Sequence, residues 1–242
     1  MPPLNRQLMT TTAKARFDSA TRTAAPTRTV SPMQVRDGDD VGALIEPTCA
    51  AVCAGHDQWR RAAFFRDIRI MGPSAIGGTL DGPALEPLIR VSLPATASRS
   101  AGRYGATVAA VIGEAWAEYQ QSFRVPGLPW YPPFAAWPGP AAPPTPNVPT
   151  PLIACTSDRS RIAPTSLRDR MTRRFGGATP LSTPFFDAIA AGFDAVVSLW
   201  LPAQQVTNVL GKGPVPTFAP PYVPVGPVVM GDNIASPGHL LT

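Results

Sequence analysis

The stretch VPGLPWYPPFAAWPGPAAPPTPNVPTP, residues 125–151, contains eleven prolines and has the greatest influence on the fold that we predict. Proline fixes φ and removes a backbone donor, so we expect this stretch to adopt extended polyproline II backbone. A linker is usually polar, whereas this stretch also carries large apolar side chains, namely Leu128, Trp130, Tyr131, Phe134 and Trp137. Such side chains on an extended chain are expected to pack on this chain's own helices or on a neighbouring subunit.

A second proline-rich segment runs over residues 211–238 and has no charged residue between Lys212 and Asp232. It is also apolar, so the two segments together predict a pair of extended ribbons, 125–151 and 211–238. We expect their aromatic side chains to form protein interfaces, and the residues expected there are Trp130, Tyr131, Phe134, Trp137, Phe218 and Tyr222.

Outside the ribbons, apolar residues recur at steps of three and four, which is typical of amphipathic helices. In the clearest case Val108, Val111, Ile112, Ala115 and Trp116 lie on one stripe. This spacing predicts four helices, at about residues 46–65, 106–123, 166–175 and 184–201.

Residues 65–71 and 85–93 alternate enough to predict short strands, with a glycine-rich turn region between them. The ribbons are nevertheless long and the strands few. We therefore expect a mainly α fold with long proline-rich extended segments and little regular β structure.

The charge of the chain suggests three parts. The net charge is +5, and residues 1–36 carry six basic residues against one acid, so the remaining residues balance. We predict a basic flexible arm over residues 1–40, a small mixed helix and strand region over 41–100, and a helical core with both ribbons over 101–242. Residues 1–36 are either a solvated tail or a contact for nucleic acid or an acidic partner. Their Arg-, Ser- and Thr-rich composition also fits an organelle transit peptide.

A metal site is one alternative for Cys49, Cys53 and His56, which could share a helix face. Zinc takes four ligands in a structural site, and a fourth would have to come from a distant part of the chain, such as Cys155 or His239. We therefore favour packing of small buried thiols. The chain has only two histidines, no Walker loop and no G-x-S-x-G elbow. We predict that it is not an enzyme and that it uses no cofactor.

A local arginine cluster is the remaining charged feature, formed by Arg168, Arg170, Arg173 and Arg174 on the predicted helix 166–175. Arginines grouped in this way suggest contact with nucleic acid or an acidic partner, and equally a subunit contact or a solvated face. No run of 18 uninterrupted apolar residues occurs in the chain, so a membrane span is not expected.

The stretches VPGLPWYPPFAAWPGPAAPPTPNVPTPL and VTNVLGKGPVPTFAPPYVPVGPVVMGD resemble small structural proteins of tailed phages and phage-tail-like particles. The resemblance covers the style of residues 106–238 and implies no catalytic residues. It implies an assembly component of a virion or particle, put together in the cytoplasm, that binds copies of itself and other particle proteins. The alternative is a cellular adaptor or scaffold protein whose proline-rich segments bind a recognition domain. Ligand ribbons of that kind are usually polar, so the aromatic content favours the first interpretation.

Overall fold

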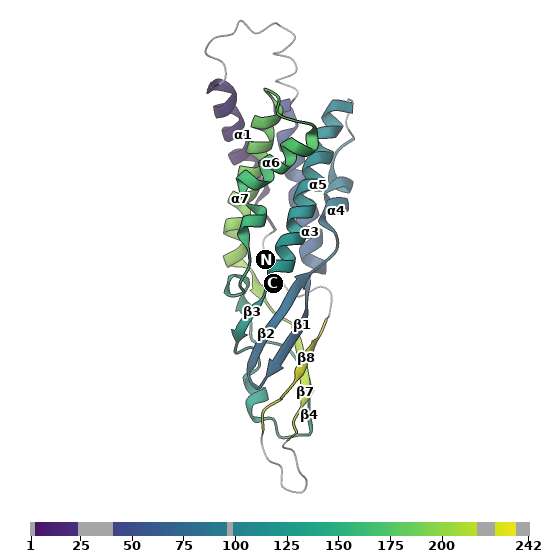
Figure 1. Cartoon of the computed structure of the whole chain (residues 1–242), viewed down its shortest axis with the longest axis vertical. Coiled ribbons are helices and arrows are strands. Elements are labelled where there is room, and N and C mark those ends of the chain that lie inside the picture. Colours follow the sequence, from purple (N-terminus) through teal and green to yellow (C-terminus); the bar gives the residue numbers. More distant parts are fainter. Residues whose placement is uncertain (1–2, 24–40, 96–98, 217–225, 236–242) are drawn as a thin grey trace, which may run out of the picture.

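The computed structural model describes residues 3–23, 41–95, 99–216 and 226–235. Helices gather at one end of the long axis of the molecule and strands at the other (Figure 1). The expectation of a mainly α fold with little regular β structure is therefore wrong. In the described residues, six α-helices are joined to a six-stranded antiparallel sheet.

Each of the four predicted helices is present. Their bounds are Ile45–Ala62 for α3, Arg99–Ser122 for α5, Pro164–Phe175 for α6 and Ser182–Ala203 for α7. Helix α6 begins at Pro164 and ends at Gly176, whose φ of 100° suits glycine because it has no Cβ. Proline at a helix start and glycine after its end are both readable in the sequence.

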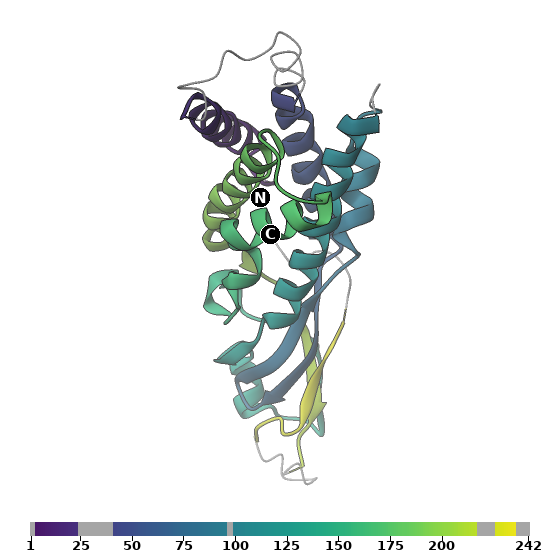
Figure 2. The same ribbon diagram turned by 45° about the horizontal axis from the view of Figure 1, so that its top comes forward.

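A further helix, α1 (Arg6–Thr23), lies in the region where we expected a flexible arm. It packs against α7, as Figure 2 shows, and its buried residues are Met9, Ala13 and Phe17, of which the first two approach Gly192 of α7. Its stripe is narrow and the rest of the helix is polar, so a search for hydrophobic periodicity does not detect it. A close approach helps to hold α1 in place, since a Cβ at Gly192 of α7 would lie 2.8 Å from the carbonyl oxygen of Met9.

Residues predicted as a strand at 85–93 instead form α4 (Leu85–Ser92). The buried residues Leu85 and Ile89 are four apart, and Glu86 accepts a hydrogen bond from Arg90 one turn later. Both spacings suit a helix, and short apolar runs are ambiguous in this respect. Helix α4 packs between α3 and α5.

The sheet has the strand order β3-β2-β1-β8-β7-β4, and all of its pairings are antiparallel. The predicted strand at 65–71 is confirmed as part of β1, whereas the glycine-rich region that follows, predicted as a turn region, contains the whole of β2. The bounds are Phe64–Met71 for β1, Ser74–Asp81 for β2, Val125–Leu128 for β3, Ala141–Thr145 for β4, Leu210–Pro214 for β7 and Gly231–Ile234 for β8. A separate short pair joins β5 (Thr150–Pro151) to β6 (Gln205–Val206).

Both ribbons therefore contribute strands, and the position of their prolines explains how. Strands β3 and β4 lie at the two edges of the sheet, and they contain Pro126, Pro143 and Pro144. Edge strands tolerate proline because the missing N–H can face away from the ladder. In the interior strands the only proline is Pro214, the last residue of β7.

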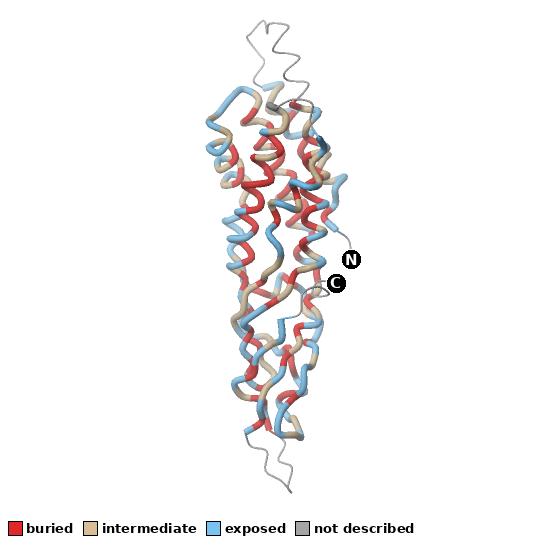
Figure 3. Tube along the Cα trace, turned by 90° about the vertical axis from the view of Figure 1, so that its right-hand side faces the viewer, coloured by how far each residue is buried: buried red, intermediate tan, exposed pale blue. Residues whose placement is uncertain are grey.

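Buried residues run through both ends of the molecule (Figure 3). At the helical end, the buried imidazole of His56 lies against Trp59, Trp116 and Trp200, with ring centroids 4.7–5.3 Å apart. At the β end, the core is built on Ile70 of β1 and on aromatic side chains of the first ribbon. The buried residues form one hydrophobic cluster.

Candidate functional site

The aromatic residues of the first ribbon face the inside of this chain. Trp130, Tyr131 and Phe134 are fully buried, and Trp137 is partly buried against the core. The remaining two predicted interface residues, Phe218 and Tyr222, lie outside the described residues. The structure thus uses the described ribbon aromatics as core.

The hydrogen bonds of the ribbon confirm this role. The Tyr131 hydroxyl donates to the carbonyl oxygen of Val209 at 2.7 Å, and its backbone N–H donates to that of Pro73 at 2.9 Å. The rings of Tyr131 and Phe134 stack with centroids 5.0 Å apart. Burial raises the pKa of Tyr131, so the hydroxyl stays protonated and acts as a structural donor.

This packing defines two sides of the sheet. We call the side covered by the ribbon the inner face, and Ile70 lies on it. Gly211 lies there too, because a Cβ at this residue would be 2.5 Å from the Ile70 side chain and 2.6 Å from the Tyr131 ring. We call the opposite side the outer face; it carries Arg69, Met71, Ile76, Lys212, Met230, Asp232 and Ile234, and all seven side chains are exposed.

A single cross-strand row crosses the middle of the outer face. The register pairs Ile76 of β2 with Arg69 of β1, Arg69 with Asp232 of β8, and Asp232 with Lys212 of β7. The charged members of this row alternate in sign. Within the described residues, no ion pair within 4.0 Å engages any of these three charged groups.

Apolar side chains lie beside this charged row. Met71 of β1 and Met230, the residue before β8, are 65% and 85% exposed on the same side of this row. Met230 has a φ of 52°, a left-handed conformation that is uncommon for residues other than glycine. Large exposed apolar side chains grouped on a sheet face are typical of an interaction surface. One sign of this face is visible in the sequence, namely the alternation of Ile68 and Ile70 with Arg69 and Met71.

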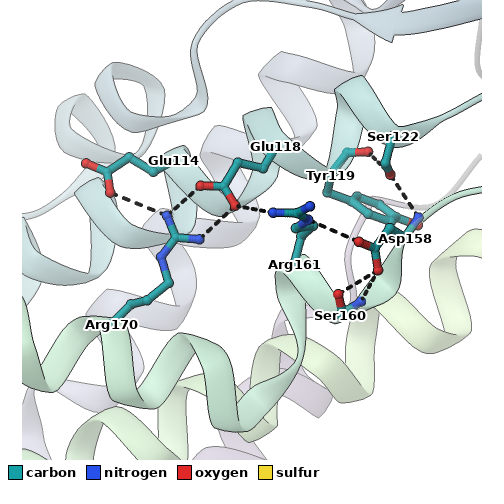
Figure 4. Close-up of polar contacts among 8 residues, drawn as sticks. All are labelled: Glu114, Glu118, Tyr119, Ser122, Asp158, Ser160, Arg161 and Arg170. Atoms are coloured by element: carbon teal, nitrogen blue, oxygen red, sulfur yellow. Dashed lines mark hydrogen bonds and ion pairs between the residues drawn. The ribbon is translucent and has the colours of Figure 1, made fainter.

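The predicted arginine cluster lies on α6 but is neutralised by neighbouring acids (Figure 4). Arg170 donates two hydrogen bonds to the carboxylate of Glu118, at 2.9 and 3.1 Å, and Arg174 donates to Glu114. Arg168 contacts Asp169 and Asp187. Of the four, Arg173 alone has no ion pair in the described part of the chain, and its side chain is exposed.

The same network continues to the short 3-10 helix η3 (Arg159–Ile162). Arg161 bridges Glu118 of α5 and Asp158, and Asp158 accepts hydrogen bonds from Ser160. Bonds from Ser160, and then Arg161, lower the pKa of Asp158. Figure 4 shows the guanidinium groups of Arg161 and Arg170 among the carboxylates of Glu114, Glu118 and Asp158, and Arg174 adds a third guanidinium group at Glu114. Such a balanced set joins α5 to α6 and offers phosphate little net positive charge.

The residues considered for a metal site are buried but face different neighbours. Cys53 Sγ lies 3.6 Å from Met9 Sδ of α1, whereas His56 lies among the three tryptophans. Burial raises the pKa of Cys49 to about 12 and that of Cys53 to about 11, so both remain thiols. Within the described ranges, no group of three His, Cys, Asp or Glu residues is placed to hold a metal ion.

A groove of about 360 Å³ lies between β2, α4 and α5. Its charged side chains are already engaged, since Arg66 pairs with Asp81, Glu86 with Arg90, and Glu114 with arginines of α6. The charged side chains that line the groove are therefore paired with one another or with residues beside it.

Helix α7 is the one helix in the described part of the chain that is long and apolar enough to cross a membrane. Most of that apolar window is buried against other elements, including Phe185, Phe193 and Trp200. A core helix has these same properties, so they are weak evidence for a span.

Comparison of the chain with protein-family models, with curated proteins and with solved structures finds no match.

Proposed function

We propose that this chain is a structural component of a virion or phage-tail-like particle and binds neighbouring particle proteins through the outer face of its sheet. The observation that carries the proposal is the outer face itself. It combines exposed methionine and isoleucine side chains with a charged row that has no ion-pair partner among the described residues. An apolar surface with charges of both signs is suited to a specific protein contact.

The assignment to a particle rests on the resemblance of the two proline-rich stretches to small structural proteins of tailed phages. The packing of the first ribbon is compatible with that proposal in a modified form. Its aromatic side chains stabilise the chain itself, and the contacts with neighbours pass to the other side of the same sheet.

The adaptor alternative is less well supported by the packing. A proline-rich ligand offers its side chains to an aromatic groove of a recognition domain. Here Trp130, Tyr131 and Phe134 are buried, so residues 125–151 would have to leave the core before such a domain could bind them.

Fractionation of the native source tests the proposal. An antibody against the purified chain would be applied to density-gradient fractions of cells that carry the gene and of the particles they release. We expect the chain to band with particles in a fixed ratio to their major proteins. Its recovery only as a free protein or small complex, while particles of constant composition band without it, would contradict the proposed function.

A further inference from the structure

We propose that the outer face pairs with the outer face of a second copy of this chain, about a two-fold axis that runs between β1 and β8 and parallel to them. This inference rests on the proposed use of the outer face as an interface and names the partner that the face fits. The argument uses the order of side chains across the sheet, their charges and their exposure.

The charge order selects this axis. The row reads Ile76, Arg69, Asp232, Lys212 across β2, β1, β8 and β7. A two-fold axis between β1 and β8 places Arg69 opposite the second copy's Asp232, and Asp232 opposite its Arg69. An axis perpendicular to the strands through this row would instead oppose each charge with itself. Two-fold interfaces must be self-complementary, and of these two axes only the first makes the charges so. An axis between β8 and β7 would oppose Asp232 with Lys212 but would leave Arg69 over β4, which carries no charged residue.

The apolar side chains fit the same arrangement. Met71 lies two residues after Arg69 on β1, and Met230 lies two residues before Asp232 ahead of β8, so the axis brings Met71 of one copy toward Met230 of the other. Methionine side chains are flexible and polarisable, and they adapt to one another at contact surfaces. Ile76 then lies opposite Lys212, whose aliphatic stem can cover it while the ammonium group remains in water.

The size of the face sets the expected strength. Its four central strands, spaced about 4.8 Å apart, span roughly 15 Å between the outermost strand axes. A surface of this width is at the small end for a stable protein interface. We therefore expect a dissociation constant of roughly micromolar order or weaker, so that pairing depends on protein concentration.

A charge-swap experiment tests the pairing. Asp232→Arg makes the central charges of the face all positive, and Arg69→Asp makes the pair at β1 and β8 all negative. We expect each variant alone to dissociate at least about tenfold more readily than the unaltered chain, because like charges then meet. Mixing the two variants opposes Arg with Asp at both positions and should restore pairing as a heterodimer. Light scattering after size exclusion over a concentration series, with one variant carrying a mass tag, measures this.

Matched neutral variants separate contact from folding. Met71→Ser combined with Met230→Ser should weaken pairing, whereas Leu199→Ser on α7 should leave it unchanged. Leu199 is 64% exposed, which matches the 65% of Met71. Thermal unfolding followed by circular dichroism identifies any variant that no longer folds.

Two outcomes would overturn the inference: a folded, unaltered chain that stays monomeric at the highest concentration, or folded charge variants that do not pair when mixed. Gradient fractionation tests the proposed function separately, and its result does not depend on either of these outcomes. A heterodimer from the mixture supports the inference even if the chain never bands with particles, in which case only the particle assignment fails.

Discussion

Both faces of the sheet have large apolar side chains but use them in opposite ways. On the inner face, Ile70 is fully buried beneath the first ribbon, whose Tyr131 and Phe134 are fully buried as well. On the outer face, Met71 and Met230 are largely exposed. The difference teaches that aromatic content in a proline-rich stretch does not identify an interface, because the same side chains can complete a core within their own chain. The exposed outer face is formed in part by β1 and β8, which lie more than 150 residues apart in sequence.

The substitution expected to have the largest effect on stability is Trp130→Ala, on the inner side of the sheet. Trp130 is 1% exposed, and removing a buried tryptophan side chain costs about 3–5 kcal/mol of the free energy of unfolding. Urea unfolding followed by circular dichroism measures the loss. The partly buried Trp137 provides the control, and Trp137→Ala should cost clearly less. Equal and small losses for both variants would show that the ribbon is not part of the core.

The pH dependence of stability extends the comparison of buried and exposed groups to the helical end of the molecule. Burial, with a smaller contribution from Arg60, lowers the pKa of His56 from 6.5 to about 3. The folded chain therefore favours the neutral imidazole. Its contribution to stability is complete above pH 6.5 and is lost as the pH falls from 6.5 towards 3, which amounts to roughly 2.5 kcal/mol by pH 4.5. The variant His56→Phe should lose less stability over this range in urea titrations. An unchanged pH profile would mean that His56 is not enclosed as described.

Adjacent residues of β7 offer a closer comparison of the two faces. Gly211 lies on the inner face against Ile70 and Tyr131, whereas Lys212 is exposed on the outer face. Gly211→Val should overpack the inner face and cost about 1–3 kcal/mol. Lys212→Val introduces the same side chain one residue later and should change stability by less than about 0.5 kcal/mol. Similar costs at both positions, measured by thermal unfolding, would remove the distinction between the faces.

The smallest expected effect has the opposite sign. Met230 adopts a φ of 52°, where glycine fits without steric cost. Met230→Gly should therefore raise the stability of the single chain by about 0.5 kcal/mol while it weakens pairing through the outer face. Unfolding and concentration-dependent light scattering report these two effects independently. A loss of stability would show that the methionine side chain contributes to the fold of the chain itself.

Sequence periodicity predicts the helices well because their information is local. The stripes of α5 and α7 and the proline and glycine at the ends of α6 can all be read from neighbouring residues. Helix α1 escaped prediction because its buried side chains are few, and α4 because an eight-residue apolar run fits either a helix or a strand.

The sheet was harder to predict because its pairings are long-range and its strands have unusual composition. Gly77 and Gly78 of β2 both adopt positive φ, which a turn would also explain. Strand β8 pairs with β1 across most of the chain, and no local pattern encodes that partner. The outer face could not be foreseen for the same reason, since its rows exist only once β1, β7 and β8 are aligned. The choice between burial within the chain and contact with a neighbour likewise depends on what the folded chain leaves uncovered.

The prolines of β3 and β4 also limit how this molecule can grow into larger structures. A strand added to either side would meet positions that cannot donate to a new ladder, so fibre-like polymerisation through the sheet is discouraged at both margins. Stacking of one sheet upon another remains open, and a two-fold stack ends with two members because the outer face of each copy is then covered by the other. The proline-rich composition that predicts extended apolar ribbons thus favours association that stops at a defined number of copies.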